Sequence, residues 1–367
     1  MKAVFLSRWL GNPYKRILAK HLEDRDVTVN ESRWSVFFLP KVLSNGIPDI
    51  LHLHTLHPFV IPNRKLLRPF KVLLFVSQIL FLRILGAKTV WTVHEWNDKI
   101  NSGEDEVSRL EAKIIGKIFH AIIVHCDSTK KEIITYFCLE GRDKVIVISH
   151  GNYIDHYQNK IDQKQAREAL KLPDEDLVFL LFGSIYPYKG ILEAIHAFKR
   201  LDSNNSSLVI AGKFDLSTSI QRDLQDAIEA QIKDAPNIQF IPTKIPDDDV
   251  QTYMNSCDCV LTPYQVFTTS GVALLAMSFG KACIAPKRGF FDDVLDNSGA
   301  ILYQFDSEDG LFEAMSDALT RRTALGKMGL HNFKLAKQCS WEYVADRTFS
   351  VYTSSANSEP LNLAAKS

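Results

Sequence analysis

A chain of 367 residues most often folds as two domains, and 46% apolar with 23% charged residues is ordinary for a soluble globular protein. Lysine plus arginine and aspartate plus glutamate each number 43, so the zero net charge gives no support for a nucleic-acid partner. The six cysteines include no Cys-x-x-Cys pair and indicate buried thiols in a reducing cytoplasm.

The first elements form a strand, a glycine turn and a capped helix. Residues 2–6 are an apolar run without a cleavage signature, and no apolar run in the chain is long enough to span a bilayer. Gly11 turns the chain, Asn12 can cap the next helix, and Pro13 suits its first position. The predicted helix runs to about His21. Glycine loops at the carboxyl end of a first strand bind ligands in doubly wound folds, although a capped helix alone also explains the pattern.

Histidines follow two further predicted strands. His52 and His54 alternate along the strand predicted over 48–54, and His57 comes next. A zinc site is a weak alternative, because no second cluster of ligands is present; we expect a structural His52 and a His54 near a cleft. The strand over 88–93 delivers His94 and Glu95 at its carboxyl end, where they are candidates for acid–base chemistry or sugar hydroxyl contacts.

The segment 64–83 is apolar and edged with basic residues. A helix packed in the core is the favoured interpretation. The alternative is a helix lying on an anionic membrane surface, with its basic residues at the lipid headgroups.

A domain junction is expected in the polar stretch that begins near His150, and the βα pattern then repeats. An apolar strand over 177–182 ends at Gly183 and Ser184, and Lys189 opens the helix that begins near Ile191. A helix start with a lysine favours an anion. The sequence is not a Walker A loop, because no second glycine precedes the lysine and no Ser or Thr follows it.

A second helix start of this kind follows the strand over 259–263. Tyr264 begins the loop, Thr268 continues it, and Thr269 or Ser270 can cap a buried helix over 272–279. Gly271 lets a ligand approach the backbone. Two such helix starts in one half of the chain indicate a diphosphate held by both.

The pattern of two βα halves predicts an α/β fold with two doubly wound, Rossmann-like domains facing an interdomain cleft. The expected boundaries are 1–155 for the first domain, 156–340 for the second, a helix over 341–353 that packs back on the first domain, and a disordered tail over 354–367.

In order and spacing, the chain resembles the family 4 glycosyltransferases of the GT-B fold, also described as glycosyltransferase group 1. The matching segments are the Gly11 loop, 48–59, 88–95, 121–129, 145–153, 182–190, 208–213 and 262–286. The resemblance implies transfer of a sugar from a nucleotide-diphosphate sugar to an acceptor hydroxyl, without a metal or other cofactor. It implies donor binding by the second domain and acceptor binding by the first.

The resemblance also assigns residues. Lys189 matches the lysine that contacts the donor phosphates, and Thr269, Ser270 and Gly271 fall in the loop that cradles them. Gly11 matches the loop near the reacting sugar, and His94 matches the histidine that reaches the transferred sugar.

This sequence departs from the family pattern at two places. Ser184 and Tyr186 stand where many relatives carry an arginine, which leaves Lys213 as the candidate substitute. Thr268 and Leu275 stand where relatives carry the two carboxylates of Glu-x7-Glu. These departures keep two alternatives open: a catalytically degenerate partner subunit, and a sugar-nucleotide epimerase or a phosphorylase of the same fold. The expected location is the cytoplasm, at the inner face of the membrane if 64–83 contacts lipid, with a carbohydrate or lipid-linked acceptor from polysaccharide or glycolipid assembly.

Overall fold

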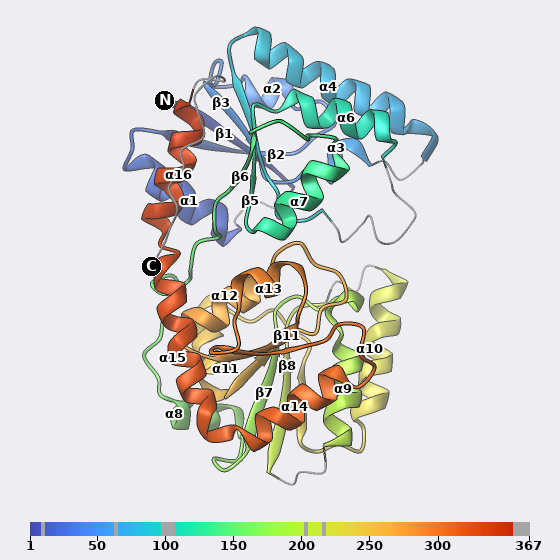
Figure 1. The fold of residues 1–367 in the computed structure, drawn as a ribbon, viewed down its shortest axis with the longest axis vertical. Coiled ribbons are helices and arrows are strands. Elements are labelled where there is room, and N and C mark those ends of the chain that lie inside the picture. The colour runs from blue at the N-terminus through green and yellow to red at the C-terminus, as the bar shows by residue number, and fades with distance from the viewer. Residues whose placement is uncertain (9–11, 62–64, 97–106, 202–204, 215–217, 355–367) are drawn as a thin grey trace. The chain divides into compact units, whose positions relative to one another are not determined.

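The computed structural model describes residues 1–8, 12–61, 65–96, 107–201, 205–214 and 218–354. The chain divides into two compact units (Figure 1). Unit 1 comprises Met1–His150 and Trp341–Ser367, and unit 2 comprises Gly151–Ser340. The division therefore falls five residues before the boundary expected at 155, at the end of a short strand and before the polar connection.

Unit 1 contains a parallel sheet of six strands in the order β2-β1-β3-β4-β5-β6. The strands are β1 (Lys2–Ser7), β2 (Thr28–Arg33), β3 (Ile50–Leu53), β4 (Lys88–Thr92), β5 (Ala121–Val124) and β6 (Val145–Val147). Strands β1, β3, β4 and β5 are almost continuously buried, as expected for a sheet covered on both faces. Strand β2 is not predicted from the sequence, because this edge strand is mostly polar and carries no apolar run.

The helices of unit 1 cover the sheet and include the last helix of the chain. They are α1 (Pro13–Glu23), α2 (Leu39–Val42), α3 (His57–Val60), α4 (Arg68–Ile84), α6 (Arg109–Ile118), α7 (Asp127–Tyr136) and α16 (Trp341–Thr353), with a 3-10 turn η1 (Lys65–Leu67). Helix α16 is fixed to this unit by Arg25, which contacts Asp346 at 2.7 Å, and by Tyr352, whose hydroxyl lies 2.6 Å from Nδ1 of His52.

Unit 2 repeats the architecture with the strand order β12-β11-β10-β7-β8-β9, again all parallel. The strands are β7 (Leu177–Phe182), β8 (Ser206–Ala211), β9 (Ile238–Ile241), β10 (Cys259–Leu261), β11 (Ala282–Pro286) and β12 (Ala300–Tyr303). The helices are α8 (Gln163–Leu170), α9 (Ile191–Arg200), α10 (Ser219–Ile232), α11 (Val250–Ser256), α12 (Gly271–Ser278), α13 (Gly289–Val294), α14 (Gly310–Thr320) and α15 (Arg322–Gln338). Two 3-10 turns, η2 (Pro187–Lys189) and η3 (Asp247–Asp249), precede α9 and α11.

Both sheets reverse their order at one internal position. In unit 2 the order reverses between β7 and β10, which are hydrogen-bonded neighbours. In unit 1 it reverses between β1 and β3. Ligands of open α/β sheets bind outside the carboxyl ends of the strands at such points. The loop after β7 and the loop after β10 are the two segments that the sequence analysis had singled out.

Candidate functional site

The loop after β7 in unit 2 owes its path to two glycines. Gly183 ends the strand with φ of +96°, and Gly190 precedes α9 with φ of +67°. Between them the turn η2 carries Lys189, and no side chain caps α9 at Gly190. The first turn of α9 therefore keeps backbone amides that no side chain caps, directly after the turn that carries Lys189.

This loop is locked to the loop after β10 by backbone contacts. A Cβ at Gly190 would lie 2.1 Å from the carbonyl oxygen of Pro263. The backbones of the two loops therefore approach to a distance that only glycine permits. The amide of Gln265 donates a hydrogen bond to the carbonyl of Tyr188 at 2.7 Å. The two predicted helix starts thus form one site.

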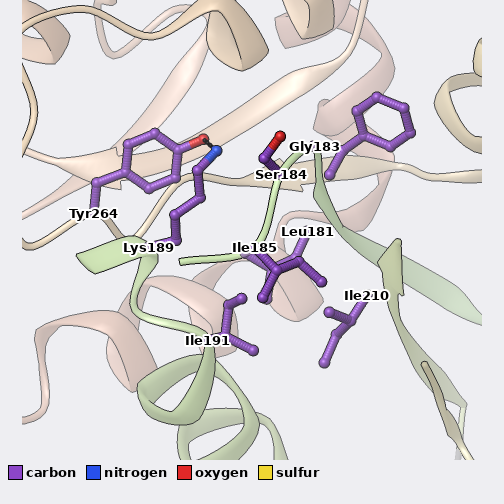
Figure 2. A pocket seen from close by; sticks show the side chains of 9 residues that line it. Leu181, Gly183, Ser184, Ile185, Lys189, Ile191, Ile210 and Tyr264 are labelled. Carbon is purple, nitrogen blue, oxygen red and sulfur yellow. Dashed lines mark hydrogen bonds between the residues drawn. The ribbon is translucent and has the colours of Figure 1, made fainter. Parts of the chain in front are cut away.

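A polar contact between Lys189 and Tyr264 lies in this site (Figure 2). The Lys189 Nζ donates to the Tyr264 hydroxyl at 3.0 Å and lies 4.6 Å from the centroid of the same ring. A Cβ built at Gly183 would lie 3.7 Å from this Nζ, so the glycine leaves room for the amine. Gly183, Ser184, Lys189 and Tyr264 line one pocket, whose floor is aliphatic.

The N-terminus of α12 lies against the same pocket. Ser270 caps α12, because its Oγ accepts a hydrogen bond from the amide of Ala273 at 3.1 Å. A Cβ at Gly183 would lie 3.2 Å from Cγ2 of Val272, in the first turn of this helix. Thr268 is buried, Thr269 is half-buried and Gly271 is exposed. Of the two predicted caps, Ser270 is therefore the correct one.

Lys213, the predicted substitute for the missing arginine, lies at the end of β8 beside Ser184. Its carbonyl accepts a hydrogen bond from the amide of Ile185 at 2.9 Å, and its side chain is exposed. Lys213 is not among the residues that line the pocket. The structure thus brings the backbone of Lys213 to the site and leaves its side chain exposed.

Two residues near this site were missed by sequence reasoning. Tyr153 is buried, and a Cβ at Gly271 would lie 3.4 Å from its hydroxyl, so Tyr153 borders the start of α12. Arg288 lies with its guanidinium 3.9 Å from the ring centroid of Phe305 and donates to the carbonyl of Gln265 at 3.5 Å. Tyr153 belongs to the segment 145–153 that carries the family resemblance, but nothing in its local sequence indicates that it reaches α12.

Unit 1 collects histidines at the carboxyl ends of its strands. His54 Nδ1 lies 3.2 Å from His94 Nε2, and the two rings stack 5.4 Å apart. Tyr14 packs its ring edge-on against His94 at 4.5 Å, and His125 lies 5.2 Å from the same ring. His52 is buried between the hydroxyls of Tyr352 and Thr92, which confirms its structural assignment.

Burial holds these histidines in the neutral form. It lowers the pKa of His52 to about 3 and that of His125 to about 4. The pKa values of His54 and His94 are held well below 6.5, first by burial and then by the neighbouring histidines and the Lys15 ammonium group. The cluster therefore offers neutral imidazoles, which can donate and accept hydrogen bonds but are weak bases.

Asn12 and Glu95, two further predicted residues of unit 1, follow the carboxyl ends of β1 and β4. Asn12 caps α1 through its Oδ1, which accepts from the amide of Tyr14 at 2.9 Å. Glu95 follows β4 and is exposed. Gly11 lies outside the described residues. Within the parts of the chain that the structure describes, no group of three or more His, Cys, Asp or Glu side chains could hold a metal ion.

The acidic run Asp247–Asp249 lies between Pro246 and α11. It forms the 3-10 turn η3, and no side chain makes a capping hydrogen bond to α11. The Asp248 carboxylate instead accepts a hydrogen bond from Gln158 at 2.8 Å.

Part of unit 2 matches the sequence model of a known family. Residues 162–331 match the family model of Glycosyl transferases group 1. Lipopolysaccharide 1,2-N-acetylglucosaminetransferase of Salmonella typhimurium is 27% identical over 209 residues, 55% of each chain. GDP-mannose:glycolipid 4-beta-D-mannosyltransferase of Xanthomonas campestris pv. campestris is 27% identical over 173 residues, 46% of each chain. The chain thus matches about half the length of these curated relatives.

Solved structures match nearly the whole chain. Sucrose-phosphate synthase from Thermosynechococcus elongatus superposes with a TM-score of 0.76 at 14% identity, covering 96% of this chain and 98% of that one. HepE of Anabaena in complex with UDP-glucose gives 0.73 at 16% identity, with 95% and 99% covered. At these identities the likeness establishes the fold. The two six-stranded parallel sheets with their helices are therefore those of a GT-B glycosyltransferase fold, and residues 162–331 carry the sequence pattern of the group 1 glycosyltransferases.

Proposed function

We propose that the protein is a glycosyltransferase that moves a sugar, in the simplest case a hexose, from a nucleotide-diphosphate sugar to an acceptor hydroxyl. The observation that carries this proposal is the position of Lys189. Its ammonium group is held by Tyr264 in a pocket that Ile191, the first residue of α9, also lines and against which α12 begins. Two helix N-termini and a lysine at one switch point suit a diphosphate.

In the proposed reaction, unit 2 stabilises the leaving group, which is the nucleoside diphosphate. The bond between the anomeric carbon and the diphosphate oxygen breaks, its electron pair stays on the diphosphate, and the acceptor oxygen forms the new bond to carbon while losing its proton. Fixed positive groups at the diphosphate lower the energy of this charge most effectively where water is excluded. Lys189, Ser184 and the amides at 269–271 are the proposed contacts. They supply the charge stabilisation without a metal or other cofactor.

Unit 1 supplies the proposed contacts to the acceptor and the transferred sugar. His54 and His94 are neutral near pH 7, so they suit hydrogen bonds to sugar hydroxyls better than proton abstraction. Glu95 is exposed and follows His94 after β4. We assign the carboxylate of Glu95 to the acceptor proton and the imidazole of His94 to the transferred sugar. Asn12 and Gly11 belong to the same proposed region.

The proposed acceptor is a carbohydrate or a lipid-linked carbohydrate of polysaccharide or glycolipid assembly. The names of the curated relatives, which refer to lipopolysaccharide and to glycolipid, support this class. No helix in the described parts of the chain has the length and apolar character needed to cross a membrane. We propose that the protein works in the cytoplasm and contacts the inner face of the membrane peripherally.

Donor binding tests the proposal directly. UDP-, GDP- and ADP-sugars are added in turn, and both the unfolding temperature and the dissociation constant are measured, since a ligand of the native state raises its apparent stability. Lys189→Ala removes the proposed phosphate contact, and Lys164→Ala is the matched control, because Lys164 is an exposed lysine on α8. Losing a charge-assisted hydrogen bond of about 1.5–3 kcal/mol should weaken binding by about 10- to 150-fold in Lys189→Ala alone.

Product analysis separates the alternatives. A transferase releases free nucleoside diphosphate and gains a glycosylated acceptor. An epimerase returns a nucleotide sugar of unchanged mass with a different sugar. A catalytically degenerate subunit with a preserved pocket binds the donor and releases nothing. If no nucleotide sugar binds the wild-type protein, or if Lys189→Ala binds as well as Lys164→Ala, the assignment of the diphosphate site is wrong.

A further inference from the structure

Helix α4 in unit 1 is apolar on both of its faces. Its inner face is buried through Val72, Phe75, Val76, Ile79 and Leu82. Its outer face continues from the turn η1 and is formed by Leu66, Leu67, Pro69, Phe70, Leu73, Ser77, Leu80, Phe81, Ile84 and Leu85, all of them exposed. We call this set the α4 face. Surface helices normally turn a polar side to water, so a helix that is apolar all round needs a second covering surface.

The exposure on the α4 face is large and follows the helical repeat. Leu66 is 92% exposed, Phe70 67%, Leu73 66% and Ile84 83%. These four positions are spaced by four, three and eleven residues, which places them along one stripe. Ser77 is the polar residue within the stripe. The segment 64–83 was favoured as a helix packed in the core, and that interpretation holds for one face only.

Helix α6 extends the same surface. Arg68 on α4 contacts Glu111 on α6 at 3.4 Å, and Arg83 donates to the carbonyl of Ile118 at the end of α6 at 3.1 Å. Leu110 is 68% exposed on this neighbouring helix. Figure 1 shows α4 and α6 together along one side of the unit. The apolar surface therefore spans two helices and is fixed by contacts at both ends.

Positive charge surrounds this surface. Helix α4 carries Arg68, Lys71 and Arg83, and α6 carries Arg109, Lys113 and Lys117 against one carboxylate, Glu111. From Ile50 to His94 the sequence contains no aspartate or glutamate.

The cations also gather at one end of the two helices. The pKa of Lys144 is lowered to about 8, first by burial and then by Arg142, Arg83 and Lys117. These groups therefore lie close enough to repel one another, and a layer of negative charge would relieve that repulsion.

We propose that the α4 face lies flat in the surface of an anionic lipid bilayer, with its apolar side chains among the acyl chains and the basic residues of α4 and α6 at the headgroup phosphates. A helix of 17 residues, about 25 Å long, suits the interface rather than a span. The proposal deepens the lipid-linked acceptor of the proposed function and rests on that function for its biological meaning. It brings unit 1 to the surface where such an acceptor resides.

A second copy of the chain is the main rival as a cover for this face. A two-fold interface places the same patch of both subunits in contact. The basic residues around the α4 face of one copy would then face those of the other, and only Glu111 on these helices could offset the repulsion. Charge therefore favours an anionic bilayer over self-association.

The test is flotation of the full chain with vesicles of phosphatidylglycerol and phosphatidylcholine, compared with vesicles of phosphatidylcholine alone, without donor or acceptor. The apolar variant is Phe70→Gln, Leu73→Gln and Ile84→Gln. Its control is Ile220→Gln with Leu330→Gln, because these residues are 64% and 62% exposed on unit 2. All five side chains are solvent-exposed, so the replacements should leave the folded chain intact. Circular dichroism and an unchanged unfolding temperature verify this.

Charge is tested separately with Lys113→Gln and Lys117→Gln, two exposed lysines of α6. Their control is Lys164→Gln with Lys327→Gln, two exposed lysines of unit 2.

We expect the wild-type chain to float with anionic vesicles and much less with neutral ones. The apolar variant should lose at least about tenfold in partition coefficient, and the charge variant should lose about tenfold on anionic vesicles only. Both control pairs should behave like the wild type. Added salt should weaken binding of the wild type, because it screens the attraction to the headgroups.

The proposal is overturned if the wild type fails to bind anionic vesicles, or if the apolar variant binds as well as its control. A wild-type dimer in sedimentation velocity that the apolar variant abolishes, together with no vesicle binding, would assign the α4 face to a second copy. Because vesicle binding is measured without any nucleotide sugar, its failure leaves the donor site untouched. Failure of donor binding likewise leaves the vesicle result intact.

Discussion

Gly190→Ala should break the contact that joins the loop after β7 to the loop after β10. Gly190 has φ of +67°, and a Cβ there would lie 2.1 Å from the carbonyl oxygen of Pro263. An ordinary Cβ contact begins near 3.4 Å, so one loop must move by more than 1 Å. The left-handed conformation costs an L-residue about 1–2 kcal/mol. Overpacking against rigid backbone adds about 1–3 kcal/mol. We expect a total loss of about 2–5 kcal/mol.

Gly280→Ala is the matched control in the same unit. Gly280 has φ of +64°, nearly that of Gly190, but a Cβ there meets its nearest neighbour, the Gly329 carbonyl, at 3.7 Å. Backbone strain and the lost flexibility of the unfolded chain are then the same in both variants. The difference between them isolates the clash with Pro263, and we expect it to be about 1–3 kcal/mol.

The assay follows urea unfolding by far-ultraviolet circular dichroism and by tryptophan fluorescence together. All five tryptophans (9, 34, 91, 96 and 341) belong to unit 1, so fluorescence reports that unit alone while circular dichroism reports both. Nucleotide-sugar affinity is measured in parallel and should fall for Gly190→Ala only. Equal losses of stability in the two variants, or a full-affinity Gly190→Ala, would show that the loops are not locked together as described.

Three further predictions concern the pocket, the departures from the family pattern and the histidines. Tyr264→Phe removes the hydroxyl that holds the Lys189 amine at 3.0 Å, and calorimetric titration with the bound nucleotide sugar should show an affinity loss of up to about tenfold; unchanged affinity would mean that the hydroxyl does not position the lysine. Leu275→Glu restores a family carboxylate at a side chain that is 5% exposed, and it should cost about 3 kcal/mol or more in urea unfolding rather than improve donor binding. Burial lowers the pKa values of His52, His54 and His125, so below pH 6.5 the unfolded chain binds protons that unit 1 does not. Its stability is therefore complete above pH 6.5, and at pH 5.5 the tryptophan-detected unfolding free energy should be lower by about 4 kcal/mol. A flat profile between pH 7.5 and 5.5 would contradict the neutral state of these histidines.

Strong local signals made most of the fold predictable from sequence. The buried strand 177–182 has the bounds expected, because it is a continuous apolar run that ends before Gly183. The short elements were missed. Helices α2 and α3 have four residues each, and α13 has six, which is too little for a helical repeat to be visible. Tertiary packing rather than propensity fixes such elements.

The parts of the site that depend on local sequence, namely turns and helix starts, were predictable. Glycine, lysine and serine at strand ends pointed to Gly183, Lys189 and Ser270, which the structure brings to one pair of neighbouring loops. Long-range approaches could not be predicted in the same way. Tyr153 lies more than a hundred residues before Gly271, and Arg288 reaches its partners only because α13 begins where it does.

The two departures from the family pattern have different physical consequences. Phosphate recognition needs helix N-termini, a cation and room for close approach, and these depend on glycines and caps that the chain retains at Gly190 and Ser270. Thr268 and Leu275, at the positions where the family resemblance implies two carboxylates, are 3% and 5% exposed. A carboxylate at 275 would be buried in α12, a helix whose residues 273–278 are all buried, and would lose the water that stabilises its charge. Helix α12 is therefore stabilised by apolar packing at the position where the resemblance implies a carboxylate. We infer that the proposed diphosphate site works through Lys189 and two helix N-termini without the arginine, and that the donor's sugar is recognised without carboxylates at positions 268 and 275. The neutral histidines His54 and His94 of unit 1 are the proposed residues for recognition of that sugar.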